Sequence, residues 1–277
     1  MHSTASDGTD TPDQILDKVR RSGLMMFSLT DHDAVKGCLD IAARLTDGDP
    51  EFITGAEFSC RDEMGRYHIL GYRIDAESSP VRKVLETGHG YRMTKLRERL
   101  EFLKTRYGFS FSDEDTRQLY ARNNPGKPHI ARLMVKYGFS ESVDAAFRDY
   151  LNQIESHSGY LRPEQAIEGI LAGGGIPVLA HPAFGSGNQR IYGDELEKRV
   201  VRLMGFGLRG LEALYSGFGA DITAGLIGLS ERYRLYVTAG SDYHGTSKTV
   251  ALGDTGCLAS SEVPDGMKRF LCDVLDG

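Results

Sequence analysis

The chain has 277 residues, of which 40% are hydrophobic and 26% are charged. This composition, without any low-complexity run, excludes a disordered or fibrous protein, and the length suits one large α/β unit, with or without an insertion. The formal net charge of −6 argues against a duplex DNA partner, because the DNA backbone is itself negatively charged.

The sequence predicts neither a membrane segment nor a disulfide framework. No apolar stretch approaches the roughly 18 residues that span a bilayer. The polar first residues also lack the basic and then apolar pattern of a secretory signal, so we expect a cytoplasmic protein without a membrane partner. The four cysteines, Cys38, Cys60, Cys257 and Cys272, form no C-x-x-C pair and are expected to be buried or inert thiols. The oligomeric state is not indicated.

The first 78 residues predict alternating helices and strands. A Thr-Pro pair at Thr11 suits the cap and first position of a helix that ends near Gly23. The apolar run LMMFSL, bounded by turn signals, is typical of a strand covered on both faces. The elements expected next are a helix over 35–45 and strands near 51–59 and 67–74. This alternation favours the α/β class.

Residues 79–160 change to a helical pattern. They hold a long charged stretch, VRKVLETGHGYRMTKLRERLEFLKTRYGF, and two shorter helical stretches. The segment contains 14 Lys and Arg against 10 Asp and Glu, a net charge of +4, whereas the rest of the chain has 19 against 29, a net charge of −10. We therefore expect an inserted, locally basic helical lid domain over 79–160.

The alternation of strands and helices resumes after residue 160. A Gly-rich stretch ends a helix that begins near Arg162. The later elements are expected as strands near 176–180, 208–215 and 235–240 and as helices over 193–204, 220–233 and 264–275. Six or seven strands with covering helices favour a closed or nearly closed barrel, formed by residues 1–78 and 161–277.

Residues that can bind metal ions lie in or directly after several of these strands. They are Asp31, His32 and Asp33, then Glu57, then His68, then His181, and finally Asp242 and His244. Because the carboxyl ends of barrel strands meet on one face, most of these side chains are expected to converge. Imidazole and carboxylate groups bind divalent cations, and several together suit metal-assisted hydrolysis.

The other histidines divide into two kinds. His2 lies near an acidic residue in a glycine turn, Asp7-Gly8. His89, His129 and His157 have no such neighbour and are expected to be unrelated to a metal. Glu212 and Tyr215 end another expected strand, where they either line the site or serve the fold.

Six motifs, in the order HSTASDG, SLTDHD, GAEFS, HILGY, AHP and GSDYHG, resemble the polymerase and histidinol phosphatase (PHP) family. The resemblance is greater to its nucleotide-phosphatase branch, which carries a helical insertion, and it covers about the first 75 and about the last 110 residues. It implies a distorted (β/α)7 barrel with an inserted small α-helical domain. It also implies a trinuclear centre with up to three divalent metals, namely manganese, iron or zinc (Mn, Fe or Zn).

Carried over by position, the resemblance implies three ligand sets, two of which share Glu57. The first metal would be held by His2, Glu57 and Asp242, and the second by Glu57, His68 and His181. The third would be held by Asp7, His32 and His244. Asp33 would orient His32, because a metal-bound imidazole usually needs an acceptor for its other nitrogen.

His2 matches only half of a family motif. The family has His-x-His here, and the first histidine would stand one position before Met1. Either a segment precedes Met1 in the natural chain, or the first metal has fewer ligands, or a tag residue replaces the histidine. We favour a preceding segment, because the strand that would place this loop in the barrel is also missing.

The resemblance implies a metal-dependent phosphoesterase, a hydrolase that cleaves a phosphate monoester of a nucleotide by metal-bound hydroxide. No catalytic side chain is expected beyond the metal ligands. The basic insertion favours a nucleoside phosphorylated at its 3′ and 5′ positions, with one phosphate bound by the insertion while the other is cleaved. The candidate substrate-binding residues are Lys127, His129, Arg132 and Arg148. A solvated helix surface is the competing interpretation for each of them.

Three other interpretations stay open. The first is a phosphatase for a small metabolite, of the histidinol phosphate type, and the second is a 5′-3′ exonuclease for short oligonucleotides. The third is a non-catalytic scaffold stabilised by metal, which only the missing partner of His2 favours. The basic helical insertion argues against a small metabolite, because a small substrate needs less cover.

Overall fold

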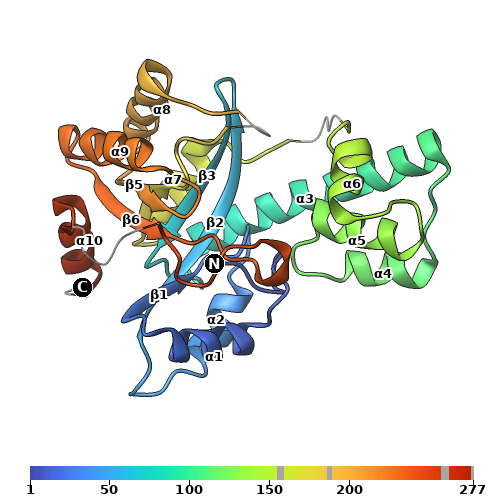
Figure 1. The fold of residues 1–277 in the computed structure, drawn as a ribbon, viewed down its shortest axis with the longest axis horizontal. Helices are drawn as coiled ribbons and strands as arrows, with labels where there is room; N and C mark the ends of the chain where they lie inside the picture. Colours follow the sequence, from blue (N-terminus) through green and yellow to red (C-terminus); the bar gives the residue numbers. More distant parts are fainter. Residues whose placement is uncertain (155–158, 186–188, 257–261, 276–277) are drawn as a thin grey trace.

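The computed structural model describes residues 1–154, 159–185, 189–256 and 262–275. Within these residues the chain forms one six-stranded sheet with helices around it and a group of helices to one side (Figure 1). His157 and Cys257, for which the sequence gave expectations, lie outside the described residues.

The six strands lie in the sheet in their sequence order. They are β1 (Met26–Leu29), β2 (Glu51–Asp62), β3 (Gly65–Tyr72), β4 (Ile176–Leu179), β5 (Gly210–Tyr215) and β6 (Tyr236–Gly240). All six strands expected from the apolar runs are confirmed. β1 pairs parallel to β2, and β4, β5 and β6 pair parallel to one another.

β3 runs against the other strands, which is a departure from simple strand and helix alternation. It pairs antiparallel with both β2 and β4. Only Glu63 and Met64 separate β2 from β3, and Gly65 has φ 132°. A two-residue connection joins antiparallel strands, whereas parallel strands need a crossover of a dozen or more residues. The remaining five strands therefore share one direction.

Helices cover the sheet on its outer side (Figure 1). They are α1 (Pro12–Ser22), α2 (Lys36–Ala42), α7 (Pro163–Ala172), α8 (Gly193–Gly205), α9 (Ala220–Arg232) and α10 (Asp265–Leu275). α1 begins with a capping box, in which Thr11 and Gln14 satisfy each other's backbone N–H groups, and it ends at Gly23 with φ 75°. The expected cap and stop of this helix are confirmed.

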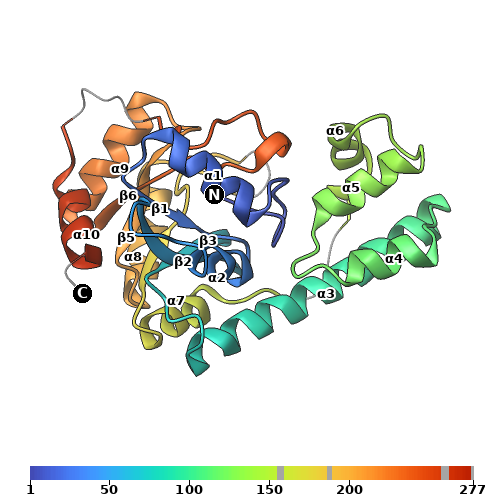
Figure 2. The same cartoon turned by 90° about the horizontal axis from the view of Figure 1, so that it is seen from below.

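The middle of the chain is helical, as expected. Its elements are α3 (Ser79–Tyr107), α4 (Asp113–Tyr120), α5 (Lys127–Lys136), α6 (Val143–Ala146) and a π-helical turn over Phe147–Leu151. α4, α5, α6 and the C-terminal part of α3 lie to one side of the sheet (Figure 2). They enclose a hydrophobic core of their own around residues such as Leu103, Ile130 and Leu151.

α3 belongs to both halves of the molecule. Its first turns place Val81 and Val84 in the core beside the sheet, whereas Leu96 and Leu103 lie in the second core. A helix of 29 residues is about 43 Å long. α3 is therefore a continuous rod that connects the two cores.

The sheet is a curled half-barrel. Among the described residues, no strand pairing joins β1 to β6. A mostly apolar cavity of about 350 Å³ lies between them, and Phe27, Val237 and Phe270 are among its lining residues. None of the described helices is long and apolar enough to cross a bilayer.

The thiols differ in exposure. Cys38 and Cys60 are buried, as expected, and Cys272 is exposed. Burial raises the pKa of Cys38 to about 11 and that of Cys60 well above its usual range. These two thiols are therefore protonated and unreactive near neutral pH.

Candidate metal centre

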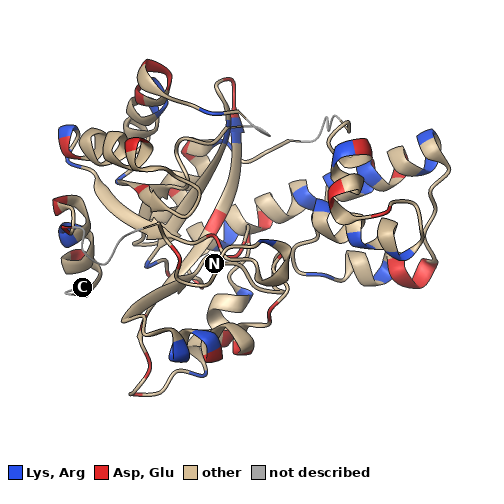
Figure 3. Ribbon diagram, in the orientation of Figure 1, with Lys and Arg blue, Asp and Glu red and all other residues tan. Residues whose placement is uncertain are grey.

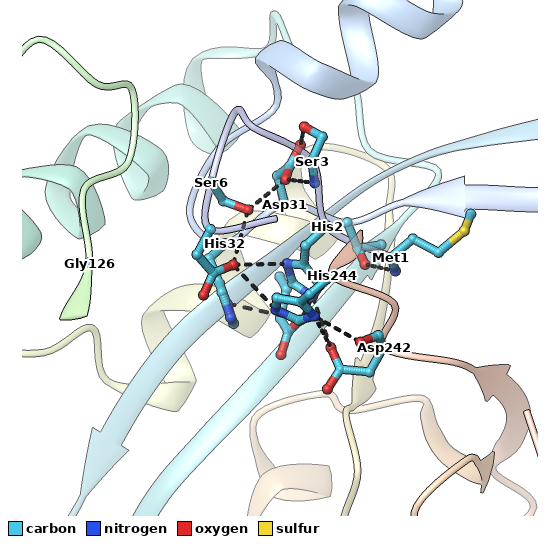
Figure 4. Close-up of polar contacts among 12 residues, drawn as sticks. Met1, His2, Ser3, Ser6, Asp31, His32, Gly126, Asp242 and His244 are labelled. Carbon is cyan, nitrogen blue, oxygen red and sulfur yellow. Dashed lines mark hydrogen bonds and ion pairs between the residues drawn. The ribbon is translucent and has the colours of Figure 1, made fainter. Parts of the chain in front are cut away.

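All eight residues expected to bind metal lie together at one edge of the sheet. The N-terminal loop supplies His2 and Asp7, the segment after β1 supplies His32, and β2 and β3 supply Glu57 and His68. His181 follows β4, and Asp242 and His244 follow β6. Figure 4 shows His2, His32, His244 and Asp242 pointing toward one another.

Glu57 lies at the middle of the group. Its Oε2 is 3.0 Å from His2 Nε2 and 4.0 Å from His32 Nδ1. Its Oε1 is 2.6 Å from His68 Nδ1 and 3.4 Å from His181 Nε2. One carboxylate thus faces four imidazoles, two at each oxygen, which is the arrangement of a bridging ligand.

The second side of the centre gathers around His2 and Asp7. Asp7 Oδ1 is 3.3 Å from His244 Nε2, and the rings of His2 and His244 stack with centroids 4.1 Å apart. His2 Nε2 is also 3.2 Å from Asp242 Oδ1. Three groups have candidate ligand atoms all within 4.8 Å of one another: His2, Asp7, His32 and His244; His32, Glu57 and His68; and His2, Glu57 and Asp242.

Unpaired buried nitrogens show that these residues fit divalent ions. Within the described part of the chain, the Nδ1 atoms of His2, His32 and His181 are buried without a hydrogen-bond partner. A buried polar atom without a partner costs free energy, and a metal ion would supply that partner. Together with three carboxylates, this donor set matches the nitrogen and oxygen ligands of borderline and hard cations.

The carboxylates of the centre are held in their charged form. Burial alone would raise their pKa values, but the surrounding imidazoles hold the pKa of Asp7, Glu57 and Asp242 well below the usual range. Burial opposes the charged form of His2, yet hydrogen bonds with Asp242 and Glu57 raise its pKa to about 9. Burial lowers the pKa of His32 well below its ordinary value.

Three of the surrounding loops hold non-glycine residues in the left-handed region. Asp33, His181 and Asp242 have φ values of 46°, 31° and 50°. This conformation is unfavourable for residues with a Cβ and gathers at functional sites, where the surrounding structure imposes it. The strain lies in the segments that follow β1, β4 and β6 and carry the candidate ligands.

Asp31 holds the N-terminal loop in place. Its carboxylate accepts hydrogen bonds from Ser3 N, Ser3 Oγ and Ser6 Oγ at 2.7, 2.7 and 2.6 Å (Figure 4). The same loop carries His2 and Asp7. Asp31 therefore positions the loop that carries His2 and Asp7, and it is not itself one of the residues grouped as candidate ligands.

Asp33 has a different partner from the one expected. Its Oδ2 accepts from Arg92 Nε at 2.8 Å, and its Oδ1 accepts from Ser59 N at 2.9 Å. His32 Nδ1 has no hydrogen-bond partner among the described residues. The expectation that Asp33 orients His32 is wrong, because a cation from α3 occupies its carboxylate.

Glu212 and Tyr215 both touch the centre. Glu212 Oε2 accepts from His181 N at 2.8 Å, and the Tyr215 hydroxyl donates to Asp242 Oδ2 at 2.9 Å. Burial raises the pKa of Glu212 to about 7. Of the two interpretations open from the sequence, the structure supports contact with the site.

The candidate substrate residues occupy different surroundings. Arg132 reaches the centre, where Nη2 donates to Asp7 O at 3.5 Å and to Ser247 Oγ at 2.5 Å. Lys127 Nζ donates to Asn152 Oδ1 at 3.0 Å, and His129 Nδ1 accepts from Gly126 N at 3.0 Å. Arg148 pairs with the neighbouring Asp149 on the exposed surface. Their roles toward a substrate stay predictions.

Sequence reasoning missed other cations at the centre. Arg92 of α3 also donates through Nη2 to Ser59 Oγ at 2.8 Å, and Lys248 Nζ donates to Asp242 Oδ2. A cavity of about 230 Å³ beside the metal ligands is lined by His68, His181 and Arg66, among others. No motif marks these cations, since each is one basic residue among many in the sequence.

Comparison with known proteins defines the class. No family model matches the sequence. The chain is 30% identical over 263 residues to a phosphoribosyl 1,2-cyclic phosphate 1,2-diphosphodiesterase from Eggerthella lenta, a match that covers 88% of this chain and 92% of that one. It is 28% identical over 268 residues to a 5′-3′ exoribonuclease from Haemophilus influenzae, covering 95% of both chains. It is 26% identical over 249 residues to a 3′,5′-nucleoside bisphosphate phosphatase from Chromobacterium violaceum, covering 88% and 85%.

Solved structures agree with the fold. A protein from Bifidobacterium adolescentis described as a metal-dependent phosphoesterase superposes with a TM-score of 0.83 at 24% identity, covering 99% of this chain and 94% of that one. An amidohydrolase from Chromobacterium violaceum, solved with sulfate and without metal, superposes with a TM-score of 0.81 at 25% identity and the same coverage. The chain belongs to the PHP family of phosphoesterases. It is a hydrolase that uses divalent metal.

Proposed function

We propose that this enzyme hydrolyses a phosphate monoester of a nucleotide, foremost of a nucleoside phosphorylated at both its 3′ and 5′ positions. The observation that carries the proposal is the convergence of eight candidate metal ligands beside the cations Arg92, Arg132 and Lys248. Such a site suits a substrate with several negative charges. The similarity to a 3′,5′-nucleoside bisphosphate phosphatase supports the same substrate.

Up to three divalent ions, manganese, iron or zinc, complete the site in this proposal. His2, Glu57 and Asp242 would hold one, Glu57, His68 and His181 another, and Asp7, His32 and His244 the third. When bound, such ions act as Lewis acids that neutralise phosphoryl charge and lower the pKa of water.

The residues of the chain position the ligands and the phosphate. Asp31 fixes the loop that carries His2 and Asp7, and the Tyr215 hydroxyl fixes Asp242. Arg132 and Lys248 lie at the rim of the centre and can donate to phosphate oxygens, as preorganised donors do in phosphoryl transfer. The cavity beside His68 and His181 would receive the substrate.

The proposal includes the finer organisation expected from the sequence. It keeps the distorted (β/α)7 barrel, of which the six described strands form a curled half-barrel. The proposal also treats residues 79–160 as an inserted domain, supported by their separate hydrophobic core, and it places the enzyme in the cytoplasm.

A second candidate function is 5′-3′ removal of nucleotides from short RNA. The similarity to a 5′-3′ exoribonuclease over 95% of the chain favours it. The basic helical segment beside the metal centre would suit a substrate with several phosphates as well (Figure 3).

The test is phosphate release from a panel of substrates by the manganese-loaded enzyme. The panel holds a nucleoside 3′,5′-bisphosphate, a nucleoside 5′-monophosphate, a short 5′-phosphorylated RNA and histidinol phosphate, each also measured with a chelator. Preferred turnover of the bisphosphate, lost with chelator, is expected. His181→Ala and Asp242→Asn should each abolish turnover with the fold retained, whereas an active double variant would refute the metal mechanism.

A further inference from the structure

A group of cations lies beyond the metal centre, at the free end of the β2–β3 hairpin. Successive side chains of a strand alternate between its two faces. Arg61 and Arg66, which are partners across the hairpin, therefore share a face with Glu57 and His68. Arg66 also lines the cavity that reaches His68 and His181. The hairpin face thus runs from metal ligands to a basic end.

α3 brings further cations to this region. Arg92, Lys95 and Arg99 are spaced by three and four residues, which places them on one face of the helix. Figure 3 shows Lys and Arg recurring along α3. Arg92 Nη2 donates to Ser59 Oγ at 2.8 Å, and Ser59 is the cross-strand partner of His68. This row therefore begins at the metal centre and continues outward for about 10 Å.

The ring of Tyr160 contacts three of these cations. Lys95 Nζ is 2.9 Å from the ring centroid, and the guanidinium carbons of Arg66 and Arg61 are 5.6 and 5.7 Å from it. The face of an aromatic ring attracts cations but does not neutralise them. Tyr160 therefore gathers three positive side chains without cancelling their charge.

Two of the cations are drawn into the interior. Lys95 is only 6% exposed and lies over the Tyr160 ring. Arg99 Nε is buried without a hydrogen-bond partner in the described part of the chain. A buried cationic nitrogen without a partner is costly, so this arrangement favours binding of an anion.

The loop before α5 approaches the same row. A Cβ atom at Gly126 would lie 3.7 Å from Arg92 Nη1. Asn124, two residues earlier, is 1% exposed, and neither atom of its side-chain amide has a partner among the described residues. Lys127 follows directly. This loop thus adds a cation and an unsatisfied buried amide.

Burial and the repulsion of neighbouring cations lower the pKa values of Lys95, Arg99 and Lys127. Burial and the neighbouring Arg92 lower the pKa of Lys95 to about 7, although Asp33 opposes the shift. Burial, with Arg99 and Arg66, lowers the pKa of Lys127 to about 8. Asp33 is itself bound by Arg92.

We propose that Arg66, Lys95, Arg99 and Lys127, the α3 cation cluster, bind a second phosphate group of the substrate whose first phosphate lies at the metal centre. This inference rests on the proposed function. The second phosphate is either the other terminal monoester of a nucleoside bisphosphate or a backbone diester of short RNA, since both present the same charged oxygens.

The test compares two cluster variants with a matched variant on the same helix. Lys95→Met and Arg99→Gln each remove charged donors from the cluster, whereas Arg97→Gln removes the same charge from an exposed position of α3. With the manganese-loaded enzyme, the cluster variants are expected to raise KM for a nucleoside 3′,5′-bisphosphate or a 5′-phosphorylated RNA dinucleotide by about 10- to 100-fold. kcat and the KM for an aryl phosphate should stay close to wild type, as should all values for Arg97→Gln.

The outcomes separate the possible sources of the phosphate. An effect on RNA alone identifies a backbone diester, and an effect on the bisphosphate identifies a terminal monoester. Cluster variants that match Arg97→Gln on both substrates, or that raise KM for the aryl phosphate equally, would overturn the proposal.

A readout independent of turnover distinguishes this inference from the proposed function. In the zinc-loaded protein with ¹⁵N-labelled lysine, inorganic phosphate should raise the pKa of Lys95, and it should do so less in Arg99→Gln. No movement of the Lys95 titration would refute the cluster as an anion site. If the titration moves but no nucleotide is hydrolysed by the wild type, the proposed function fails and the anion site stands.

Discussion

Arg92 contacts Asp33 with two nitrogens: Nε and Nη2 lie 2.8 and 2.7 Å from Asp33 Oδ2. The side chain of Asp33 is 2% exposed and that of Arg92 is 18% exposed. This ion pair joins the rod-like α3 to the loop that carries His32. The helical segment and the metal centre are therefore linked by a buried charge pair, and not only by the covalent chain.

Removing Arg92 is expected to destabilise the protein. Arg92→Met leaves the Asp33 carboxylate buried and unpaired, which should lower the free energy of unfolding by about 3–5 kcal/mol. Arg92→Lys should recover only part of this, because an ammonium cannot make the two-point contact. Urea unfolding measures both. The exposed Arg82→Met of the same helix is the control, and an equal loss in that variant would contradict the role of the ion pair.

Changing Glu57 to Gln is expected to disable the centre. The amide cannot serve as an anionic ligand at both of its ends, so metal content should fall and kcat/KM should drop by about 10³-fold or more. Metal analysis and phosphate release check this. Glu86→Gln, an exposed change on α3, should leave both unchanged. Full metal content in Glu57→Gln would show that Glu57 is not a ligand.

Changing Asp31 to Asn tests positioning of the N-terminal loop. The Asp31 carboxylate accepts hydrogen bonds from Ser3 and Ser6. An Asn side chain would present an NH2 group, which cannot accept, to some of these donors. We expect metal affinity to weaken by about 10- to 100-fold, as for other groups that orient ligands. Competition with a chelator of known affinity gives the measurement, and the exposed Asp47→Asn serves as the control. Unchanged affinity would show that the loop holds its position without Asp31.

The stability of the protein should depend on pH through Lys95. Its pKa is about 7 in the folded chain against an ordinary value of 10.5. Between these values the unfolded chain binds a proton that the folded chain lacks, so this group makes stability rise with pH from about 7 upward and contributes no slope below that.

The variant Lys95→Met removes this dependence. It should therefore be most stabilised relative to wild type at about pH 6, and the difference should shrink toward about pH 9, as measured by urea unfolding. The exposed Lys83→Met on the same helix should show no such trend. A constant difference across this range would mean that Lys95 keeps its ordinary pKa.

Apolar runs and turn residues were enough to predict the elements of the fold. All six strands and the helices that cover them arise from local patterns, such as LMMFSL for β1 and the Thr11 cap for α1. The direction of β3 was not predicted, although its cause is local. The direction of β3 depends on the loop between β2 and β3 being only two residues long, and the pattern of apolar residues does not show the length of that loop.

The candidate ligands were found because they follow strands, and strand ends converge. Arg92 and Lys95 were not found, because each is one of 14 basic residues in a helical segment. Their significance comes from tertiary contact: Arg92 meets Asp33 across 59 positions of sequence, and Lys95 meets Tyr160. Helical periodicity places residues on a face, but it does not say what that face contacts.

The two-residue loop between β2 and β3 has a consequence for how the sequence can vary. Glu57 and His68 face the same ion site only because the loop sets the register of the two strands that carry them. A single-residue insertion between Glu63 and Met64 can turn His68 to the opposite face of the sheet. In a scan of single-residue insertions along the chain, insertions at this exposed hairpin tip should therefore reduce activity as much as changes to the candidate ligands do. Surface turns usually tolerate insertions.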